Sequence, residues 1–290
     1  MNKIDFMLTV SVENANPNGD PLSGNQPRTD SDGYGLITDV AIKHKIRHRL
    51  HHEGEDVLVL HDDIVGDGAK SILGRIKNYF EGELNLKIGK KLDPRIVLDK
   101  SFERWYDVRA FGQVYAFSGQ DFSISATGAV SVNISKSLYP ITVNDLQITK
   151  SINGSEEGIG KKGSDTMGTK SVVTKGVYVI KGSINAYLAE ANGFTEEDIE
   201  KLKQVLLTLF ANDVSAARPA GSMEVEELFW FTHSNKLGNV STKRVFDLLE
   251  FNTEIDNPDV ANYEDYEIQL NQEKVEEYQS KGLTVEYLSF

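Results

Sequence analysis

The chain has 290 residues, a net charge of −13, 39% hydrophobic residues and no cysteine. This length can bury a substantial core, either as one large domain with insertions or as two domains. The missing cysteines exclude disulfides and thiolate metal sites, no apolar run is long enough to span a membrane, and the acidic balance argues against a simple nucleic-acid binder, which needs cations.

The charge is distributed unevenly along the chain. Residues 250–290 hold eleven Asp and Glu against two Lys, whereas residues 35–52 hold four Lys and Arg against one Asp. The chain therefore combines a basic element with an acidic C-terminal region. The first residues, MNKIDFMLTVSVEN, lack the long apolar core and cleavage site of a signal peptide, and the absence of cysteine fits a reducing compartment. We expect a cytoplasmic protein.

The first predicted element is a strand, because MLTVSVEN (7–14) alternates in polarity. The loop that follows lies within residues 11–30 and holds three prolines, two glycines and four asparagines. It is either a plain connection or a rigid binding loop that offers backbone N–H groups and side-chain amides to a ligand.

A basic helix is predicted over residues 38–52, with a capping residue at its start. Lys43 and Arg47 lie one turn apart, Lys45 and Arg49 form a second such pair, and an apolar stripe separates the two pairs. Rows of cations at this spacing can follow phosphates, but they also occur on solvated helix faces. The histidines of this helix lack the Glu of a zinc-binding helix motif, so they do not predict a metal site.

The middle of the chain predicts helices and then β-structure. DVLVL (56–60) is a short strand candidate, and residues 69–80 and 94–106 have helical spacing. Residues 114–135 are β-rich, with a glycine-marked break at residue 128.

An aromatic and basic motif, YDVRAFGQVYAF, covers residues 106–117. On a sheet face its aromatic rings, among them Phe111, could stack on bases while Arg109 pairs with a phosphate. The alternative is that the rings belong to the core and that Arg109 extends past them to the solvent.

The last third of the chain begins with a polar segment. Residues 151–170 contain five glycines and almost no apolar side chain, so they predict a loop that is mobile or ordered by a partner. A strand over 176–188, a helix over 195–210 with a capping box, a strand over 225–234 and a short helix over 242–250 follow.

Motifs for catalysis are weak. SAARPAGSMEV (215–225) is either a stiff turn that displays Arg218 or a plain exit loop after a helix. The sequence contains no phosphate-binding loop with its Gly-Lys-Ser/Thr ending and no nucleophile elbow. Asp30, Asp32 and Asp39 with His44 could bind a divalent cation, and the cluster His61-Asp62-Asp63 is a second candidate, although such residues more often mark turns.

The order of the predicted elements indicates an α+β fold. A strand, a helix, a helical insertion, a hairpin region, a strand, a helix and a strand follow one another, which is close to the ferredoxin-like arrangement that RNA-recognition modules also use. That frame needs roughly a hundred residues, so the remainder must be insertions, which usually carry function.

Five stretches of the sequence follow one another in a recognisable order. They are ENANPNGDP (13–21), YDVRAFGQV (106–114), TGAVSVNISKSLYP (127–140), MGTKSVVTKGVYVIKGSINA (167–186) and SAARPAGSMEV (215–225). Together they closely resemble the Cas-seven (Cas7) family, the backbone subunit of CRISPR Cascade complexes, in its type I-C (Csd) branch. The resemblance spans about residues 5–235, and the first and last stretches are the most specific pair.

The resemblance implies one palm domain over residues 1–290, with a modified ferredoxin-like fold. It also implies a finger-like helical insertion at 54–105 and a thumb-like loop at 140–172. The acidic region at 250–290 adds nothing to the resemblance. That region could meet a basic patch of a neighbouring copy, or it could limit nonspecific RNA binding.

The resemblance also implies a function. We expect a non-catalytic subunit that binds guide RNA (crRNA) independently of sequence, stacks head-to-tail with further copies of itself and with other Cascade subunits, and presents the RNA to a target DNA strand, with no cofactor and no metal. One rival is a metal-dependent RNA endonuclease that uses Asp30 or Asp32, as related type III subunits use a loop aspartate. Another is a free metabolic enzyme on a ferredoxin-like frame.

The expected RNA contacts combine amides, cations and two apolar side chains. Asn16 and Asn18 can bond sugars and phosphates without reading bases, and Met167 can wedge between bases where the thumb crosses the RNA. The full predicted set is Asn16, Asn18, Arg28, Lys43, Lys45, Arg47, Arg109, Phe111, Lys136, Lys161, Lys162, Met167, Lys170 and Arg218.

Overall fold

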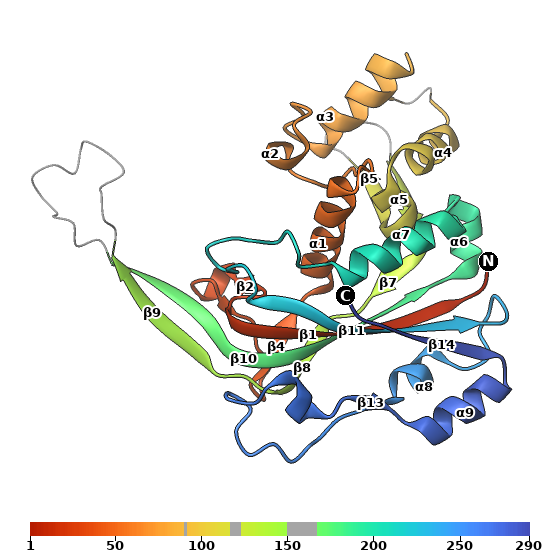
Figure 1. The fold of residues 1–290 in the computed structure, drawn as a ribbon. Coiled ribbons are helices and arrows are strands. Elements are labelled where there is room, and N and C mark those ends of the chain that lie inside the picture. The colour runs from red at the N-terminus through yellow and green to blue at the C-terminus, as the bar shows by residue number, and fades with distance from the viewer. Residues whose placement is uncertain (90–91, 117–122, 150–166) are drawn as a thin grey trace, which may run out of the picture.

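The computed structural model describes residues 1–89, 92–116, 123–149 and 167–290, and its centre is an eight-stranded sheet (Figure 1). The strand order is β14-β11-β1-β10-β8-β4, with β7 and β9 also paired to β10, and these pairings are antiparallel. The strands of this sheet are β1 (Ile4–Ala15), β4 (Tyr34–Ile37), β7 (Val130–Val132), β8 (Ser135–Pro140), β9 (Val143–Thr149), β10 (Met167–Ile184), β11 (Met223–His233) and β14 (Leu283–Leu288).

The central strand β1 is buried along most of its length, because layers cover both faces of the sheet. The strands predicted at 7–14 and 225–234 are confirmed as β1 and β11, which pair with each other. Three two-stranded ladders of the described residues lie outside the large sheet, and one of them is the hairpin that follows the helical insertion. The other two join β2 (Gly19–Asp20) to β3 (Gln26–Pro27) and β12 (Leu249–Glu250) to β13 (Gln269–Leu270).

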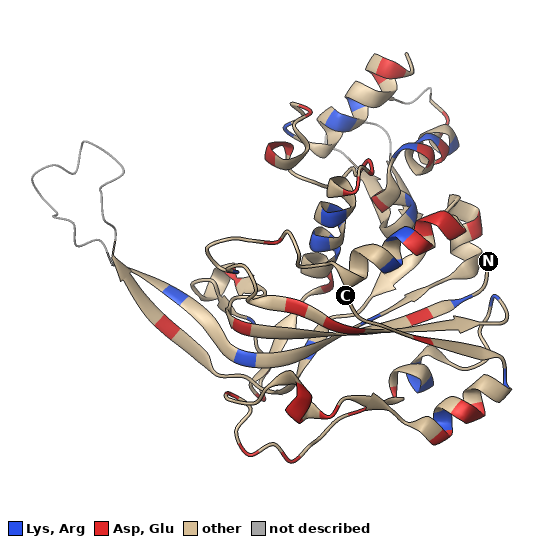
Figure 2. Cartoon of the chain, in the orientation of Figure 1, with Lys and Arg blue, Asp and Glu red and all other residues tan. Residues whose placement is uncertain are grey.

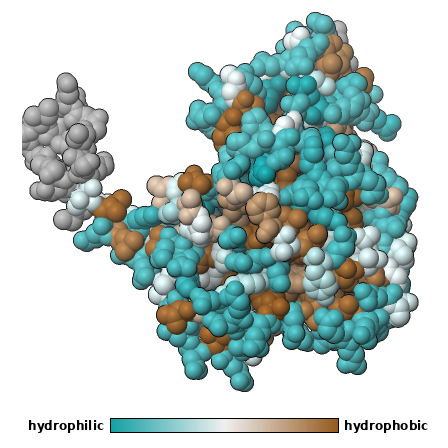
Figure 3. Space-filling view, in the orientation of Figure 1, coloured by the Kyte–Doolittle hydropathy of each residue, from teal (hydrophilic) through white to brown (hydrophobic). Residues whose placement is uncertain are grey.

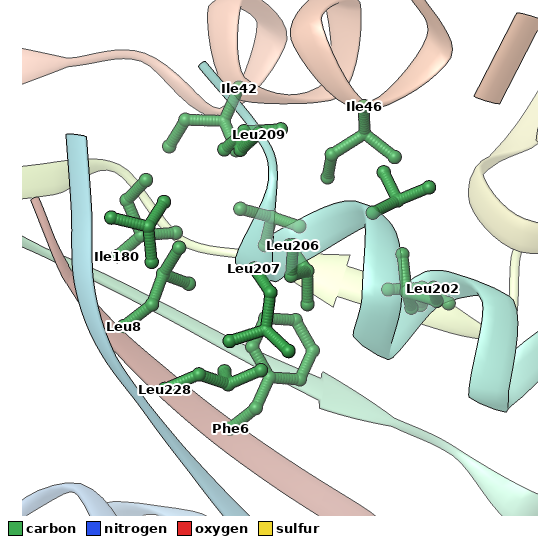
Figure 4. Close-up of a cluster of buried hydrophobic side chains, with 14 of the residues drawn as sticks. Phe6, Leu8, Ile42, Ile46, Ile180, Leu202, Leu206, Leu207, Leu209 and Leu228 are labelled. Atoms are coloured by element: carbon green, nitrogen blue, oxygen red, sulfur yellow. The ribbon is translucent and has the colours of Figure 1, made fainter. Parts of the chain in front are cut away.

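Three helices cover one face of the sheet: α1 (Asp39–His52), α6 (Ala186–Asn192) and α7 (Glu196–Leu207) (Figure 1). The predicted caps are confirmed, because Thr38 caps α1 and a capping box starts α7. Apolar side chains of α1 and α7 pack against the sheet in the main core. Figure 4 labels Phe6, Leu8, Ile180 and Leu228 of the sheet, Ile42 and Ile46 of α1, Leu202, Leu206 and Leu207 of α7, and Leu209.

The C-terminal region covers the opposite face of the sheet (Figure 1). It contributes α8 (Thr242–Phe246), a 3-10 turn (Tyr263–Tyr266), α9 (Gln272–Ser280) and the strand β14. A second core of buried residues joins this region to Met7 and Phe229 of the sheet. The acidic region 250–290 is therefore a packed layer whose charges lie outside an apolar interior. The helix predicted over 242–250 is shorter than expected, because β12 follows it.

The helical insertion has a core of its own. It holds α2 (Asp62–Val65), α3 (Ile72–Lys77), a π-helical turn (Asn78–Glu83) and α4 (Pro94–Arg104). The short helix α5 and a hairpin follow it and complete that core. Their bounds are Tyr106–Phe111 for α5, Gly112–Ala116 for β5 and Ser123–Thr127 for β6.

The strand predicted at 56–60 is wrong, because this segment forms no ladder. Side chains satisfy its backbone instead. The Asp107 carboxylate accepts from the N–H groups of Leu58 and Val59, and Arg75 donates to the carbonyls of Leu58 and Leu60. The apolar side chains that suggested a strand are buried in the insertion's core and the main core.

A hairpin of β9 and the first part of β10 stands clear of the main body (Figures 1 and 3). Most of the predicted loop 151–170 lies outside the described residues, but residues 167–170 are strand, because β9 supplies their backbone partners. The strand predicted to residue 188 ends at Ile184, where Asn185 caps α6. Among the described residues no helix is both long and apolar enough to cross a bilayer.

Candidate nucleic-acid interface

The loop after β1 is held by its own asparagines. Asn16 is buried, and its Nδ2 donates to the carbonyl of Asn25 at 2.7 Å, while its Oδ1 is buried with no hydrogen-bond partner. The Oδ1 of Asn18 accepts from the N–H of Thr38, the capping residue of α1, at 2.9 Å. Both predicted amides therefore fix the loop and its entry into α1, rather than standing free on the surface.

A carboxylate joins α1 to the predicted turn 215–225. The Oδ2 of Asp213 accepts from Lys45 Nζ and from Arg218 Nε, the latter at 2.7 Å. Arg218 also donates to the carbonyl of Asn16 at 3.4 Å. The Lys45 side chain is only 6% exposed, and this burial lowers its pKa, which Asp213 opposes. Two cations share one carboxylate here, so the cluster carries net positive charge.

A second cation of α1 is tied to α5. Arg47 Nε donates to the buried Asp107 carboxylate at 2.7 Å. The ring of Phe111 lies 5.1 Å from the Arg47 guanidinium and 5.9 Å from Lys43 Nζ, measured to the ring centroid. Lys43 itself pairs with Asp39 at 3.0 Å. Phe111 is therefore enclosed by two cations, an arrangement that stabilises their charge.

Arg109 lies in a different place, at the start of α7. Its guanidinium donates twice to the Asp198 carboxylate, at 2.9 and 2.7 Å, and stacks over the ring of Tyr106 at 4.9 Å. Asp198 also belongs to the capping box of α7. Arg109 thus fastens α5 to α7, and such bidentate pairs are strong and geometrically specific.

The more accessible cations lie nearer the sheet edge and the hairpin. The Lys136 side chain is 49% exposed and lies 2.7 Å from Asp30, whose pKa its hydrogen bond lowers. Arg28 is 32% exposed and lies 3.3 Å from Asp20. Lys170 on β10 is partly exposed, and no described carboxylate pairs with it. Lys161, Lys162 and the side chain of Met167 lie outside the described residues.

The aspartates that suggested a metal site cap turns. The Oδ1 of Asp30 accepts from the N–H groups of Asp32 and Tyr34, each at 3.0 Å. In the cluster at 61–63, Asp62 accepts from the N–H of Gly68 at 2.6 Å. Within the described parts of the chain, no group of three or more His, Asp or Glu could hold a metal ion.

The structure brings together the loop after β1, α1 and residues 213–218, but it leaves Arg109 apart. Basic residues are frequent on α1 and occur along β10, whereas acidic residues are frequent on β11 and at the start of α7 (Figure 2). Sequence inspection missed Asp107, Asp198 and Asp213, the acidic partners of the buried cations. They lie 60, 89 and 168 residues from Arg47, Arg109 and Lys45, so no local pattern could have found them.

A comparison with known protein families shows to which family the chain belongs. A family model described as CRISPR-associated protein Cas7 matches residues 2–271. The chain belongs to the Cas7 family. The Cas7 match extends beyond the 5–235 span of the sequence resemblance, and it includes α1, the projecting hairpin and residues 213–218, whereas α9 and β14 lie after it.

Two relatives illustrate the likeness. The CRISPR-associated protein Cas7 of Haloferax volcanii is 23% identical over 237 residues, which cover 76% of this chain and 68% of the relative. A chain of a solved "CRISPR RNA-guided surveillance complex, pre-nicking" superposes with a TM-score of 0.52 at 15% identity, covering 97% of this chain and 87% of that chain. At this identity the second likeness concerns the mixed α/β fold with its antiparallel sheet.

Proposed function

We propose that this Cas7 protein is a non-catalytic backbone subunit of a type I-C CRISPR surveillance complex. It binds guide RNA without reading its sequence, stacks along that RNA with further copies and other subunits, and presents it for pairing with a target DNA strand. The observation that carries the proposal is the family match over residues 2–271. A fold shared with a chain of an RNA-guided surveillance complex supports it.

The topology supports a palm, a finger and a thumb. The partial order β11-β1-β10-β7, with α1 and α7 on one face, is the strand order of a ferredoxin-like sheet and supports the palm. The separate core of the insertion supports a finger at 54–105. The projecting β9–β10 hairpin supports a thumb at 140–172 that reaches a neighbouring copy through a head-to-tail contact.

The two stretches most specific to the type I-C branch lie against each other. The N–H of Asn16 donates to the carbonyl of Ala217 at 2.8 Å, and the N–H of Glu13 donates to that of Ser222 at 2.9 Å. The two stretches therefore form one structural unit rather than two independent loops.

Exposure and partners together divide the predicted RNA contacts into two groups. Phosphates need cations that can approach them, so we assign direct contacts to the cations that are about a third or more exposed, to Lys170, and to Lys43, whose carboxylate partner lies on its own helix. The second group positions the loops, because its members are held by partners on other segments of the chain; Arg218, at 24% exposure, belongs here because it joins Asp213 to the carbonyl of Asn16. The direct group is Arg28, Lys43, Lys136, Lys170 and, on the thumb, Lys161, Lys162 and Met167; the positioning group is Asn16, Asn18, Lys45, Arg47, Arg109, Phe111 and Arg218.

The acidic layer lies across the sheet from α1. Its eleven Asp and Glu repel a polyanion. It therefore restricts RNA to the face and the edge that carry the cations, and in this way it limits nonspecific binding.

A cleavage assay separates the backbone subunit from its rival, the endonuclease. Both oxygens of Asp30 are occupied, by two backbone N–H groups and by Lys136, which suits a turn rather than a metal ligand. Purified complex is incubated with complementary RNA and Mg²⁺. We expect the RNA to stay intact. Cleavage that Asp30→Ala or Asp32→Ala abolishes would overturn the non-catalytic assignment.

A further inference from the structure

The two edges of the large sheet differ in how their backbone N–H and carbonyl groups are paired. At one edge the segment before β4 covers it: the N–H of Leu36 donates to the carbonyl of Arg28 at 2.8 Å, and the N–H of Asp30 donates to that of Tyr34 at 2.9 Å. At the other edge β14 pairs only with β11 among the described residues. One edge is closed and the other presents unpaired backbone groups.

The open edge carries none of the usual protection. Natural proteins blunt exposed edges with proline, lysine, bulges or a covering loop, because a free edge is a template for another strand. Residues 283–288 contain no Pro and no Lys, and the ladder to β11 runs without a bulge. The single charge, Glu286, is held by Lys203 of α7 at 3.1 Å. Tyr287 is 54% exposed and Phe290, just beyond the strand, is 85% exposed.

The charge around this edge indicates which strand fits. Exposed carboxylates lie on α9, the helix that packs against β14: Glu273, Glu276 and Glu277, of which Glu277 pairs with Lys281. The α7 side chain that reaches β14 is Lys203, and its charge is already balanced by Glu286. Residues 250–290 carry eleven Asp and Glu against two Lys. Two copies that paired through β14 would bring two such regions together, and the edge at β4 is already covered. A second copy is therefore disfavoured, and a cationic strand is favoured.

We propose that the free edge of β14 is a docking site for an extended, Lys- or Arg-rich segment of another protein, which adds as a further strand of the sheet. Backbone hydrogen bonds would supply affinity, and the flanking glutamates would select positive side chains. β14 lies after the residues matched by the Cas7 family model and carries none of the predicted RNA contacts, so peptide binding there can be measured separately from RNA binding.

A charged peptide pair tests the proposal on the full chain. The probes are two capped seven-residue peptides, one alternating Lys with Val and the other Glu with Val. Binding is followed by salt-dependent titration, and its location by amide hydrogen exchange. We expect the Lys peptide to slow exchange in 283–288 and to bind about tenfold more tightly than the Glu peptide at low salt.

Surface variants make the test specific. Glu273→Gln/Glu276→Gln/Glu277→Gln should weaken binding of the Lys peptide, whereas Asp63→Asn/Glu83→Gln/Asp99→Asn, exposed carboxylates of the insertion, should leave it unchanged. Equal binding of both peptides, equal loss in both variants, or slowed exchange confined to other strands would overturn the proposal. So would a dimer of the chain alone that protects 283–288, because the occupant would then be a second copy.

Discussion

Lys45 and Asp213 are separated by 168 residues in sequence and form an ion pair in the fold. The same carboxylate holds Arg218, which in turn reaches the carbonyl of Asn16. One aspartate therefore links the first helix to the stretches 13–21 and 215–225, the most specific pair in the sequence resemblance. Lys45 and Arg218 thus hold segments of the chain together, and in this way they position the surface on which RNA is proposed to lie.

Replacing this aspartate tests whether the network positions the loops. Asp213→Asn leaves the buried Lys45 without its counter-charge, so we expect the free energy of unfolding to fall by roughly 2–3 kcal/mol. The exposed pair Lys243–Asp247 gives a matched control, and Asp247→Asn should cost less than about 1 kcal/mol. Urea unfolding measures both. Equal costs for the two variants would show that the network contributes nothing special.

The accessible cations are tested through the salt dependence of RNA binding. Affinity for RNA falls as salt rises, and Lys136→Gln/Lys170→Gln should make this fall less steep. The negative slope of log affinity against log salt should shrink in magnitude by about 1.4, or about 0.7 for each lost phosphate contact on single-stranded RNA. The control variant, Lys243→Gln/Lys281→Gln, removes the same charge from the acidic side. Filter binding of a guide-length RNA supplies the slopes. If the two double variants shift the slope alike, the effect is net charge and not contact.

A close approach between β4 and β10 predicts strong coupling between two residues. A Cβ added at Gly35 would lie 2.1 Å from the Tyr178 hydroxyl, which is buried with no hydrogen-bond partner. Gly35→Ala should cost roughly 2–3 kcal/mol, Tyr178→Phe should be close to neutral, and the double variant should recover part of the loss. Gly82→Ala, where a Cβ meets nothing within 4 Å, is the control for the glycine change. Purely additive costs would contradict this geometry.

Acid should weaken the fold through Asp5. Burial by itself would raise the pKa of Asp5, but hydrogen bonds from His233 and Ser183 and the charge of Lys3 lower it below its usual value. Because Asn239 N–H donates to Nδ1 of His233, the ring proton sits on Nε2, which donates to Asp5 at 2.9 Å.

A depressed folded pKa contributes stability above the unfolded value, and this contribution is lost as the pH falls through the folded pKa. The stability of Asp5→Asn should therefore be lower at neutral pH and should fall less steeply below about pH 4. Urea unfolding from pH 7 to pH 3 measures this, with the exposed Asp256→Asn as a control that should parallel the unaltered protein. Parallel curves for all three proteins would rule out the Asp5 contribution.

Local sequence signals, such as a capping residue or an alternation in polarity, correctly predicted several helices and strands. Thr38 and Thr195 cap their helices as expected, and the alternation of residues 7–14 marks β1. The segment 56–60 was misread because distant side chains satisfy its backbone. The acidic composition of 250–290 likewise concealed a packed layer, since its buried residues are few and widely spaced.

The candidate site was predictable only in part. The sequence identified the cations, because residue type and helical spacing are local properties. The burial of these cations and the identity of their acidic partners depend on the fold. The sequence alone therefore could not show that Asp107, Asp198 and Asp213 form ion pairs with Arg47, Arg109 and Arg218. The accessible cations therefore emerge only from the fold.

The most direct test of the central claim is the composition of the purified assembly. The chain is produced together with a guide RNA and the other subunits of its complex, and native mass spectrometry then gives the number of copies per RNA and the RNA length. The account predicts several copies of this chain on one RNA of uniform length, whatever the guide sequence. An RNA-free monomer, or RNA of random length without a fixed copy number, would contradict it.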